Sequence, residues 1–237
     1  MKSTHYNLTR AWEPKIIGVK DGGSQAEIIR DGFTNKENYD RYMDYFHSKH
    51  LKENFKRTKT FPPFDISLEY IKMRKGAKLT DFISFFPVLT CAHYLISDKV
   101  ARIFSTFKMP EYKLYPVVID NNGELLKNYS LFYNPPFDFD CIAFDKSIFY
   151  TGDKFLGKIV YHRFKNFDEY YVFSQSNLVE VEKIVTKEGF DKELDYFDLR
   201  YASLPFISKD LKETFEMAGI TGIKFIETTE PELFFEE

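Results

Sequence analysis

The chain has 237 residues, enough to bury one sizeable core or two smaller ones. Hydrophobic residues make up 43% and charged residues 29%, which excludes a disordered chain. No apolar run approaches the roughly 18 residues of a transmembrane helix, so we expect no membrane partner. The only two cysteines, Cys91 and Cys141, exclude a disulfide-rich scaffold and a four-cysteine zinc site.

The net charge of −3 is unevenly distributed along the chain. Residues 1–78 carry 16 Lys and Arg against 10 Asp and Glu, whereas residues 79–237 carry 17 against 26. A nucleic-acid-binding protein usually has a strongly basic domain, so we expect no nucleic-acid partner. The acidic second part is better suited to a basic protein. The first residues show no apolar signal segment, and with two free cysteines this favours a cytoplasmic location.

Residues 1–77 are expected to form an N-terminal α+β unit that packs on the rest. The apolar runs Lys15–Lys20 and Ala26–Arg30 flank an Asp-Gly-Gly-Ser turn, which predicts a β-hairpin. Aromatic residues at three- and four-residue spacing predict an amphipathic helix over Lys36–Leu51. Alternation over Asp65–Met73 predicts a strand, and the basic stretch Lys72–Lys78 is taken as the boundary.

Residues 78–237 contain a repeated strand–helix–strand pattern. Ser97 and Ser208 each follow two apolar residues and precede apolar residues at helical spacing. Serine hydroxyls accept hydrogen bonds from the free amides of a first helical turn, so both serines are predicted N-caps. A strand is predicted after each helix, at Leu114–Ile119 and Gly222–Ile226.

The segments between the two copies are expected to be mainly extended. Further strands are predicted at Tyr129–Tyr133, Ser147–Tyr150, Gly157–Arg163 and Glu169–Phe173, with an extended segment at Asp195–Tyr201. Strand and helix both fit Leu178–Val185, and the acidic tail Glu230–Glu237 is expected to fray. The sequence therefore predicts an α+β fold with a mixed, mostly antiparallel sheet and a few flanking helices, including the two Ser-capped helices.

Several short segments occur in a characteristic order. They are Thr80-Asp81-Phe82, Leu95-Ile96-Ser97, Tyr115-Pro116-Val117, Tyr129-Ser130-Leu131-Phe132, Phe137-Asp138-Phe139-Asp140, Pro205 to Lys212 and Ala218 to Phe225. In order and spacing, residues 78–228 resemble the bacterial immunity protein eleven family, whose members neutralise toxins of polymorphic, contact-dependent secretion systems. The resemblance implies a cytoplasmic protein that binds a cognate toxin protein. It implies neither catalysis nor a cofactor.

Motifs for chemistry are scarce in the sequence. The chain contains no phosphate-binding loop, no dinucleotide fingerprint and no zinc-protease or serine-hydrolase motif. A metal site can be drawn from Asp40, Asp44 and His47 on one helix face, but a solvated polar face explains them better. Cys91 and His93 have the spacing of a nucleophile and base, yet Cys91 lies in an apolar stretch typical of a buried thiol. We therefore expect no metal.

The acidic and aromatic segment around Asp138, Asp140 and Asp145 is the candidate partner-binding surface. Carboxylates beside phenylalanines can engage a basic protein surface, although solvated loop turns explain the same pattern. Two other functions stay open at this point, an enzyme (a hydrolase or a nucleic-acid-modifying enzyme) and a structural adaptor of a secretion system. A pocket with paired carboxylates, or with His and Cys in contact, would favour the enzyme.

Overall fold

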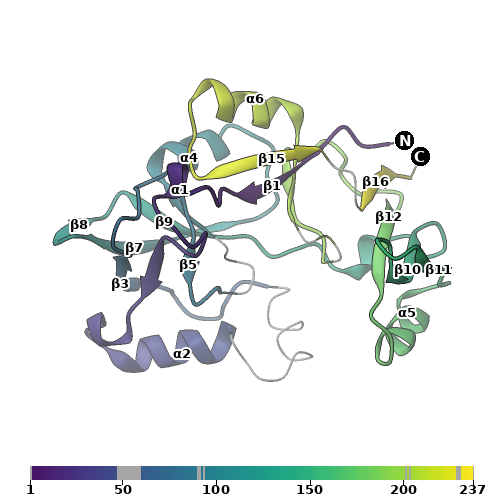
Figure 1. Ribbon diagram of the computed structural model, residues 1–237, viewed down its shortest axis with the longest axis horizontal. Coiled ribbons are helices and arrows are strands. Elements are labelled where there is room, and N and C mark those ends of the chain that lie inside the picture. The colour runs from purple at the N-terminus through teal and green to yellow at the C-terminus, as the bar shows by residue number, and fades with distance from the viewer. Residues whose placement is uncertain are drawn as a thin grey trace.

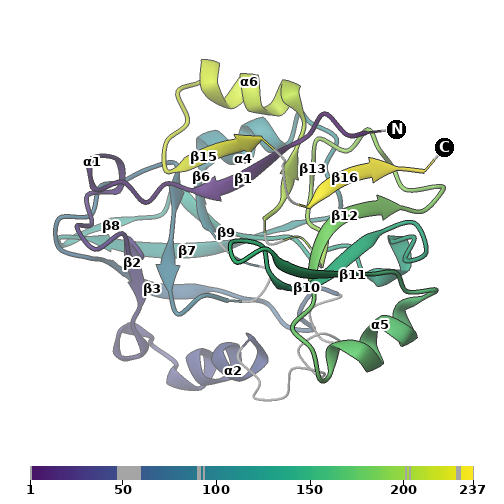
Figure 2. The same ribbon diagram turned by 45° about the vertical axis from the view of Figure 1, so that its right-hand side comes forward.

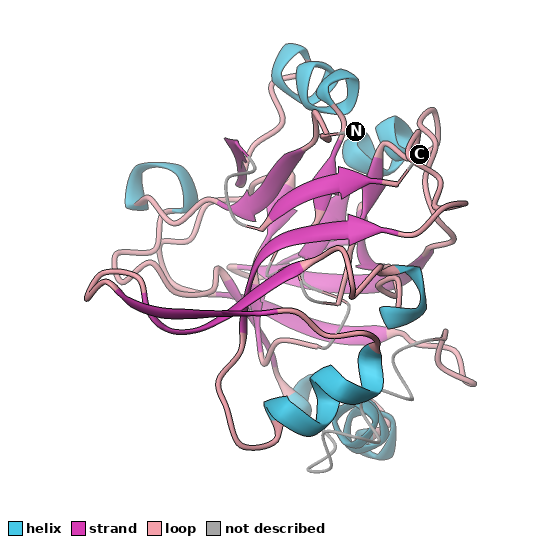
Figure 3. Cartoon of the chain, turned by 90° about the vertical axis from the view of Figure 1, so that its right-hand side faces the viewer, coloured by secondary structure: helices cyan, strands magenta, loops and turns pink. Residues whose placement is uncertain are grey.

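A computed structural model describes residues 2–46, 60–89, 92, 94–200, 202, 204–227 and 231–236. The expected α+β class is confirmed, with three sheets and helices that lie around them (Figure 3). All pairings between named strands are antiparallel except β2–β5, β3–β7 and β12–β16. None of the helices in the described ranges is long and apolar enough to span a bilayer.

The largest sheet has eight strands, in the order β4-β6-β9-β7-β3-β2-β5, with β8 added on β7. Its strands are β2 (Ala26–Ile28), β3 (Leu68–Met73), β4 (Phe82–Ile83), β5 (Phe85–Phe86), β6 (Tyr94–Ser97), β7 (Lys113–Asn121), β8 (Glu124–Leu126) and β9 (Tyr129–Tyr133). The helix α2 (Lys36–Phe46) buries Tyr42, Tyr45 and Phe46 in the core of this sheet. It lies at the opposite end of the molecule from α6 (Lys209–Met217) (Figure 1).

Two four-stranded sheets complete the fold. The first has the order β13-β14-β1-β15 and consists of β1 (Tyr6–Arg10), β13 (Tyr196–Phe197), β14 (Phe206–Ile207) and β15 (Ile223–Glu227). The second has the order β11-β10-β12-β16 and consists of β10 (Ile148–Asp153), β11 (Lys158–His162), β12 (Glu180–Thr186) and β16 (Glu232–Phe235). The helix α5 (Phe167–Ser174) accompanies the second sheet (Figure 2).

The predicted Ser-capped repeat is confirmed. Ser97 Oγ accepts from Val100 N at 3.4 Å at the start of α4 (Asp98–Phe104), and Ser208 Oγ accepts from Leu211 N at 3.1 Å at the start of α6. Each helix follows an antiparallel strand pair, β4–β6 or β13–β14, and leads to a strand, β7 or β15. The sheet orders β4-β6-β9-β7 and β13-β14-β1-β15 correspond strand for strand, with the N-terminal β1 in the place of β9.

The two copies share one core and are linked by two equivalent aspartates. Phe104 of α4 and Phe215 of α6 meet with ring centroids 5.7 Å apart, and both are fully buried. Asp81 accepts from Ser97 Oγ at 2.9 Å and from Thr221 N, beyond α6, at 3.0 Å. Asp195 accepts from Ser208 Oγ at 2.6 Å and from Lys108 N, beyond α4, at 2.8 Å. Each aspartate therefore joins its own copy to the other.

The first 77 residues are built into sheets that they share with the rest of the chain. β1 pairs with β14 and β15, β2 pairs with β5, and β3 pairs with β7. The expected packing of this unit on the remainder therefore takes the form of hydrogen-bonded strands rather than of an interface between two separate cores.

The hairpin predicted at Lys15–Lys20 and Ala26–Arg30 is wrong. Pro14–Ile17 forms the one-turn helix α1, which begins at a proline and ends at Gly18 in the left-handed conformation (φ 79°). A proline fits the first turn because its missing N–H has no helical partner there. The strand β2 pairs instead with β3 and β5, because distant residues bury its apolar side chains. The helix predicted over Lys36–Leu51 is observed from Lys36 to Phe46, beyond which lie residues outside the described ranges.

Two further predictions are wrong in the second half. Glu169–Phe173 lies in the helix α5 and not in a strand, because Asn166 caps it by accepting from Glu169 N at 3.0 Å. The tail is not frayed, since β16 pairs in parallel with β12 and buries Leu233 and Phe235. Residues 180–185 of the ambiguous segment Leu178–Val185 belong to the strand β12. The other predicted strands are found within three residues of their expected limits, and β9 matches its prediction in full. Of the extended segment expected at Asp195–Tyr201, Tyr196–Phe197 forms β13, and Tyr201 lies outside the described residues.

Candidate functional site: an acidic pocket with an aromatic floor

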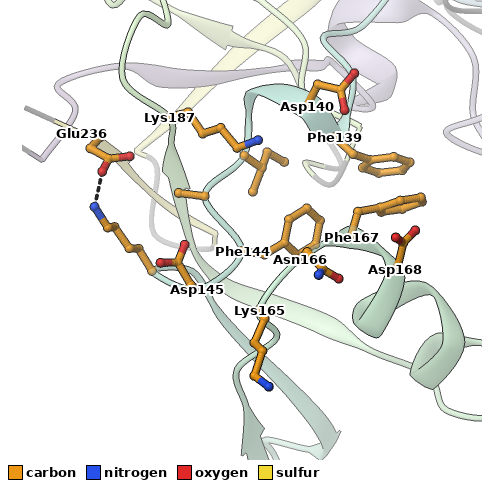
Figure 4. A pocket seen from close by; sticks show the side chains of 13 residues that line it. Phe139, Asp140, Phe144, Asp145, Lys165, Asn166, Phe167, Asp168, Lys187 and Glu236 are labelled. Atoms are coloured by element: carbon orange, nitrogen blue, oxygen red, sulfur yellow. Dashed lines mark hydrogen bonds and ion pairs between the residues drawn. The ribbon is translucent and has the colours of Figure 1, made fainter.

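A surface pocket of about 520 Å³ brings together segments that are distant in the sequence (Figure 4). It lies between residues 139–146, the start of α5, the end of β12 and the end of β16. Asp140 and Asp145, two of the three residues proposed from the sequence, both line it. The structure thus places two of the predicted carboxylates around one hollow.

The turn that carries Asp145 is fixed to the strand β12. Ser147, which is fully buried, donates to Ala143 O at 2.8 Å and accepts from Val185 N at 3.0 Å. Ala143 N also donates to Val185 O at 2.8 Å. These bonds order the backbone of the turn that carries Asp145 in the unbound protein, which limits the conformational entropy lost when a ligand binds.

The floor of the pocket is aromatic. Phe139, from the short 3-10 helix Phe139–Cys141, stacks on Phe167 of α5 with centroids 4.4 Å apart and planes 14° apart. Phe144 lies 6.1 Å from Phe167 and stacks on the buried Phe149. The faces of such rings carry partial negative charge and attract cations.

Three exposed aspartates line the same pocket as these rings, and the third was missed by the sequence analysis. Asp168 lies in the first turn of α5 and lines the pocket with Asp140 and Asp145. The signal for it is the Asn166-x-x-Glu169 spacing, a helix-capping pattern that places Asp168 at a helix start. Reading this stretch as a strand hid the signal.

Most of the positive charge around the pocket is neutralised locally. Lys146 forms an ion pair with Glu236, and this hydrogen bond raises the pKa of the lysine and lowers that of the glutamate. Lys165 lies 3.8 Å from Glu169, one helical turn into α5. Lys187 therefore faces the three aspartates as the remaining ammonium group of the lining, and the pocket has an excess of negative charge.

Asp138, the third residue proposed from the sequence, lies away from the pocket and has a structural role. Its Oδ1 lies 3.2 Å from Nε of Arg200, whose side chain is only 4% exposed. The adjacent backbones are also joined, since Phe137 N donates to Asp198 O at 2.8 Å and Arg200 N to Phe137 O at 3.3 Å. A charge reversal at Asp138 would place a like charge beside a buried guanidinium, so it does not test a surface contact.

A second, smaller hollow of about 290 Å³ lies where β1, β6 and residues 198–205 meet. Arg10, Tyr94 and Asp198 contribute polar groups to it. Burial raises the pKa of Asp198 to about 7 against the opposing attraction of Arg200, and burial also raises the pKa of Tyr94 to about 12. Asp198 could therefore exchange a proton near neutral pH. It is the one carboxyl group among the described lining residues.

The described residues do not assemble the metal site or the nucleophile and base pair considered from the sequence. No three His, Cys, Asp or Glu side chains of the described residues are grouped as metal ligands. Asp40 instead accepts two hydrogen bonds from Arg30, at 2.7 and 2.6 Å. His47, Cys91 and His93 lie outside the described residues. Burial raises the pKa of Cys141 to about 12, so its thiol is not a ready nucleophile.

The sequence contains two basic stretches, Lys49–Lys59 and Lys72–Lys78, and the structure describes the second. Arg74, in the stretch Lys72–Lys78, lies 2.9 Å from Asp21 and 3.8 Å from Glu27. Part of the positive charge of this stretch is therefore neutralised within the fold. The stretch Lys49–Lys59 lies outside the described residues.

Comparison with known proteins does not assign this chain to a family. No family model matches this sequence, and no curated protein is similar to it at a significant level. The resemblance to the immunity protein eleven family therefore stays a prediction that rests on the quoted segments. The geometry of the two hollows is the basis for inferring function.

Proposed function

We propose that this chain is an immunity protein, which binds a cognate polymorphic or contact-dependent toxin in the cytoplasm of the producing bacterium and neutralises it. The observation that carries the proposal is the pocket that Asp140, Asp145 and Asp168 line together with the Phe139–Phe167 stack. The resemblance of residues 78–228 to an immunity family supports the same function.

The pocket is suited to a basic side chain of a partner protein. A guanidinium or ammonium group above the phenylalanine rings gains about 0.5–2 kcal/mol from the cation–π interaction, depending on how far it is desolvated. The surrounding carboxylates add charge-assisted hydrogen bonds, which have roughly twice the strength of neutral ones. Inhibition by association requires this complementarity of shape and charge and no reactive group.

The test is co-expression with each candidate toxin whose gene is found beside the gene of this chain. The double variant Asp140→Lys, Asp145→Lys reverses two exposed carboxylates, whereas Asp44→Lys reverses an exposed aspartate of α2, a helix that lies apart from α5 and β12 (Figure 1). We expect the parent chain and Asp44→Lys to restore growth and to co-purify with the toxin. The double variant should bind at least about tenfold more weakly, which corresponds to a loss of about 1.4 kcal/mol.

Thermal melting of the three proteins is the control for folding, because all three substitutions lie on the surface. Undiminished rescue and affinity in the double variant would reject the acidic pocket as the binding site. Failure of the parent chain to protect cells from the neighbouring toxin would reject the immunity function itself.

An enzyme remains the second candidate because of Asp198. A carboxyl group whose pKa lies near 7, in a hollow with Arg10 and Tyr94, has the properties of a general acid or base. Turnover of a small substrate by the purified chain, abolished in Asp198→Asn, would favour this function. A structural adaptor has no comparable observation in its favour.

A further inference from the structure

The strand β11 forms an open edge of its sheet. In the part of the chain that the structure describes, β11 pairs with β10 alone, in a regular antiparallel register of five residue pairs from Lys158 opposite Asp153 to His162 opposite Phe149. Its outer backbone N–H and C=O groups are therefore available to another chain. Unprotected edges of this kind favour pairing with an added strand.

The opposite edge of the same sheet is covered by the protein itself. Along β16, Ser3 N donates to Leu233 O at 2.9 Å, and Lys2 forms an antiparallel bridge with Phe234. The edge strand β15 of the neighbouring sheet is guarded by side chains, since Lys224 forms an ion pair with Glu13 and lies over the ring of Trp12 at 4.3 Å. Among the residues that the structure describes, neither kind of protection is found along β11.

Apolar side chains accompany this open edge. Val160 and Tyr161 on β11 are more than half exposed, and Phe155 and Leu156 at the tip of the hairpin are more exposed still. Exposed apolar side chains that gather on one element mark interaction surfaces more often than scattered ones do. The hairpin β10–β11 lies at the surface of the molecule (Figure 2).

The hairpin is rigid enough to present these groups. Asp153 Oδ1 accepts from Phe155 N at 2.8 Å and from Leu156 N at 3.2 Å, which fixes the turn. Gly152 has φ +101°, and a Cβ there would lie 1.9 Å from Lys158 O, so the two strands approach closely at this point. An edge that is already ordered loses little entropy when a partner binds.

The charge of the edge indicates what kind of segment fits it. Lys158 begins β11 and Arg163 directly follows its last residue, His162, and neither forms an ion pair within the described residues. By contrast, Lys154 on the same hairpin is neutralised by Glu182 at 2.9 Å. A second copy of this chain would bring the same two cations against themselves, which disfavours self-pairing.

We propose that β11 is a docking edge that takes an extended segment of a partner protein as a fifth strand, one with alternating apolar residues at its centre and acidic residues at its ends. Main-chain hydrogen bonds supply affinity, and Lys158 and Arg163 select the acidic ends. The inference rests on the proposed function only for the identity of the partner as a toxin. The docking edge is separate from the pocket around Asp140 and Asp145.

The test uses a synthetic octapeptide, Thr-Glu-Val-Thr-Val-Thr-Glu-Thr, whose two glutamates lie five residues apart as Lys158 and Arg163 do, and a control in which lysine replaces both glutamates. We expect saturable binding of the acidic peptide at or below about 1 mM, with amide hydrogen-exchange protection on β11, and binding of the lysine peptide about tenfold weaker. Val160→Lys should abolish binding. Ile226→Lys, which alters an exposed apolar residue on the other edge strand β15, should leave it unchanged.

Four outcomes would overturn the proposal. They are no saturable binding of the acidic peptide, equal binding by Val160→Lys, a concentration-dependent dimer that Val160→Lys disrupts, or partition onto phosphatidylglycerol–phosphatidylcholine vesicles that Phe155→Ser removes. The last two would assign the hairpin to a second copy or to a membrane surface. If the chain binds the peptide but fails to neutralise the toxin, the docking edge is supported and the immunity function is rejected. If the chain neutralises the toxin but does not bind the peptide, the immunity function is supported and the docking edge is rejected.

Discussion

Asp195 joins the two copies of the Ser-capped unit. Replacing this partly exposed residue by alanine should therefore lower the free energy of unfolding more than most substitutions near the surface do. Its carboxylate accepts from Ser208 Oγ at 2.6 Å and from Lys108 N at 2.8 Å. Its own backbone N–H donates to Lys108 O at 2.8 Å, which stays in place in the variant. Asp195→Ala therefore removes two hydrogen bonds without deleting the strand.

The expected loss follows from those two bonds. A hydrogen bond to a charged group contributes about 1.5–3 kcal/mol, and the lower end applies because Asp195 is partly exposed. Two such bonds give a loss of about 3 kcal/mol, a substantial part of the roughly 5–15 kcal/mol that stabilises a domain. Ser208 still accepts from Leu211 N, so the helix α6 keeps its cap.

The matched variant is Asp81→Ala, because Asp81 makes the equivalent bonds to Ser97 Oγ and Thr221 N and accepts a further one from Thr221 Oγ1 at 3.0 Å. We expect a loss at least as large, measured from the midpoint of urea unfolding followed by circular dichroism. Asp98→Ala, which removes only a favourable charge in the first turn of α4, should cost about 0.3–1 kcal/mol. The reasoning is refuted if Asp195→Ala unfolds within about 0.5 kcal/mol of the parent chain, or no more easily than Asp98→Ala.

Three further predictions concern charged groups inside the fold. Asp138→Lys should destabilise the protein by roughly 3–5 kcal/mol in urea unfolding, because it leaves the buried Arg200 facing a like charge. Weaker toxin binding with unchanged stability would contradict this structural role of Asp138. Burial lowers the pKa of His5, so the unfolded chain binds this proton more readily and the stability of the fold should decline as the pH falls below 6.5. In His5→Gln the decline in unfolding free energy between pH 7 and 5 should be shallower, and an unchanged decline would argue against a lowered pKa of His5. Burial raises the pKa of Asp198 to about 7, so the free energy of unfolding should fall as the pH rises from about 4 to about 7, by at most about 1.4 kcal/mol per pH unit. Asp198→Asn should remove this slope, and equal slopes in both proteins would count against a raised pKa.

Where a structural signal is local, the sequence was sufficient to find it. The two Ser-capped helices were predicted because a hydroxyl and the amide it caps lie three residues apart in the same chain segment. The strands around Tyr115 and Leu131 were predicted because apolar residues at β-spacing favour a buried strand. The correct class, α+β, followed from these elements together.

The errors have a common cause, since each depends on a partner far away in the sequence or on a competing cap. Ala26–Ile28 pairs with strands more than 40 residues further along the chain, and no local turn chemistry indicates this. The tail became a strand because Leu233 and Phe235 find a buried place beside β12. The helix α5 was missed although its capping pattern, from Asn166 to Glu169, was visible in the sequence.

By itself, the sequence determined the capped helices, most strands, the acidic and aromatic composition and the scarcity of catalytic motifs. Only the tertiary structure decided which carboxylates share a pocket. It placed Asp140 and Asp145 beside Asp168, directed Asp138 to the buried Arg200, and left β11 as an open edge. The physical reason is that helix caps and strand periodicity depend on neighbours in the chain, whereas pockets, buried ion pairs and sheet edges depend on which distant segments pack together.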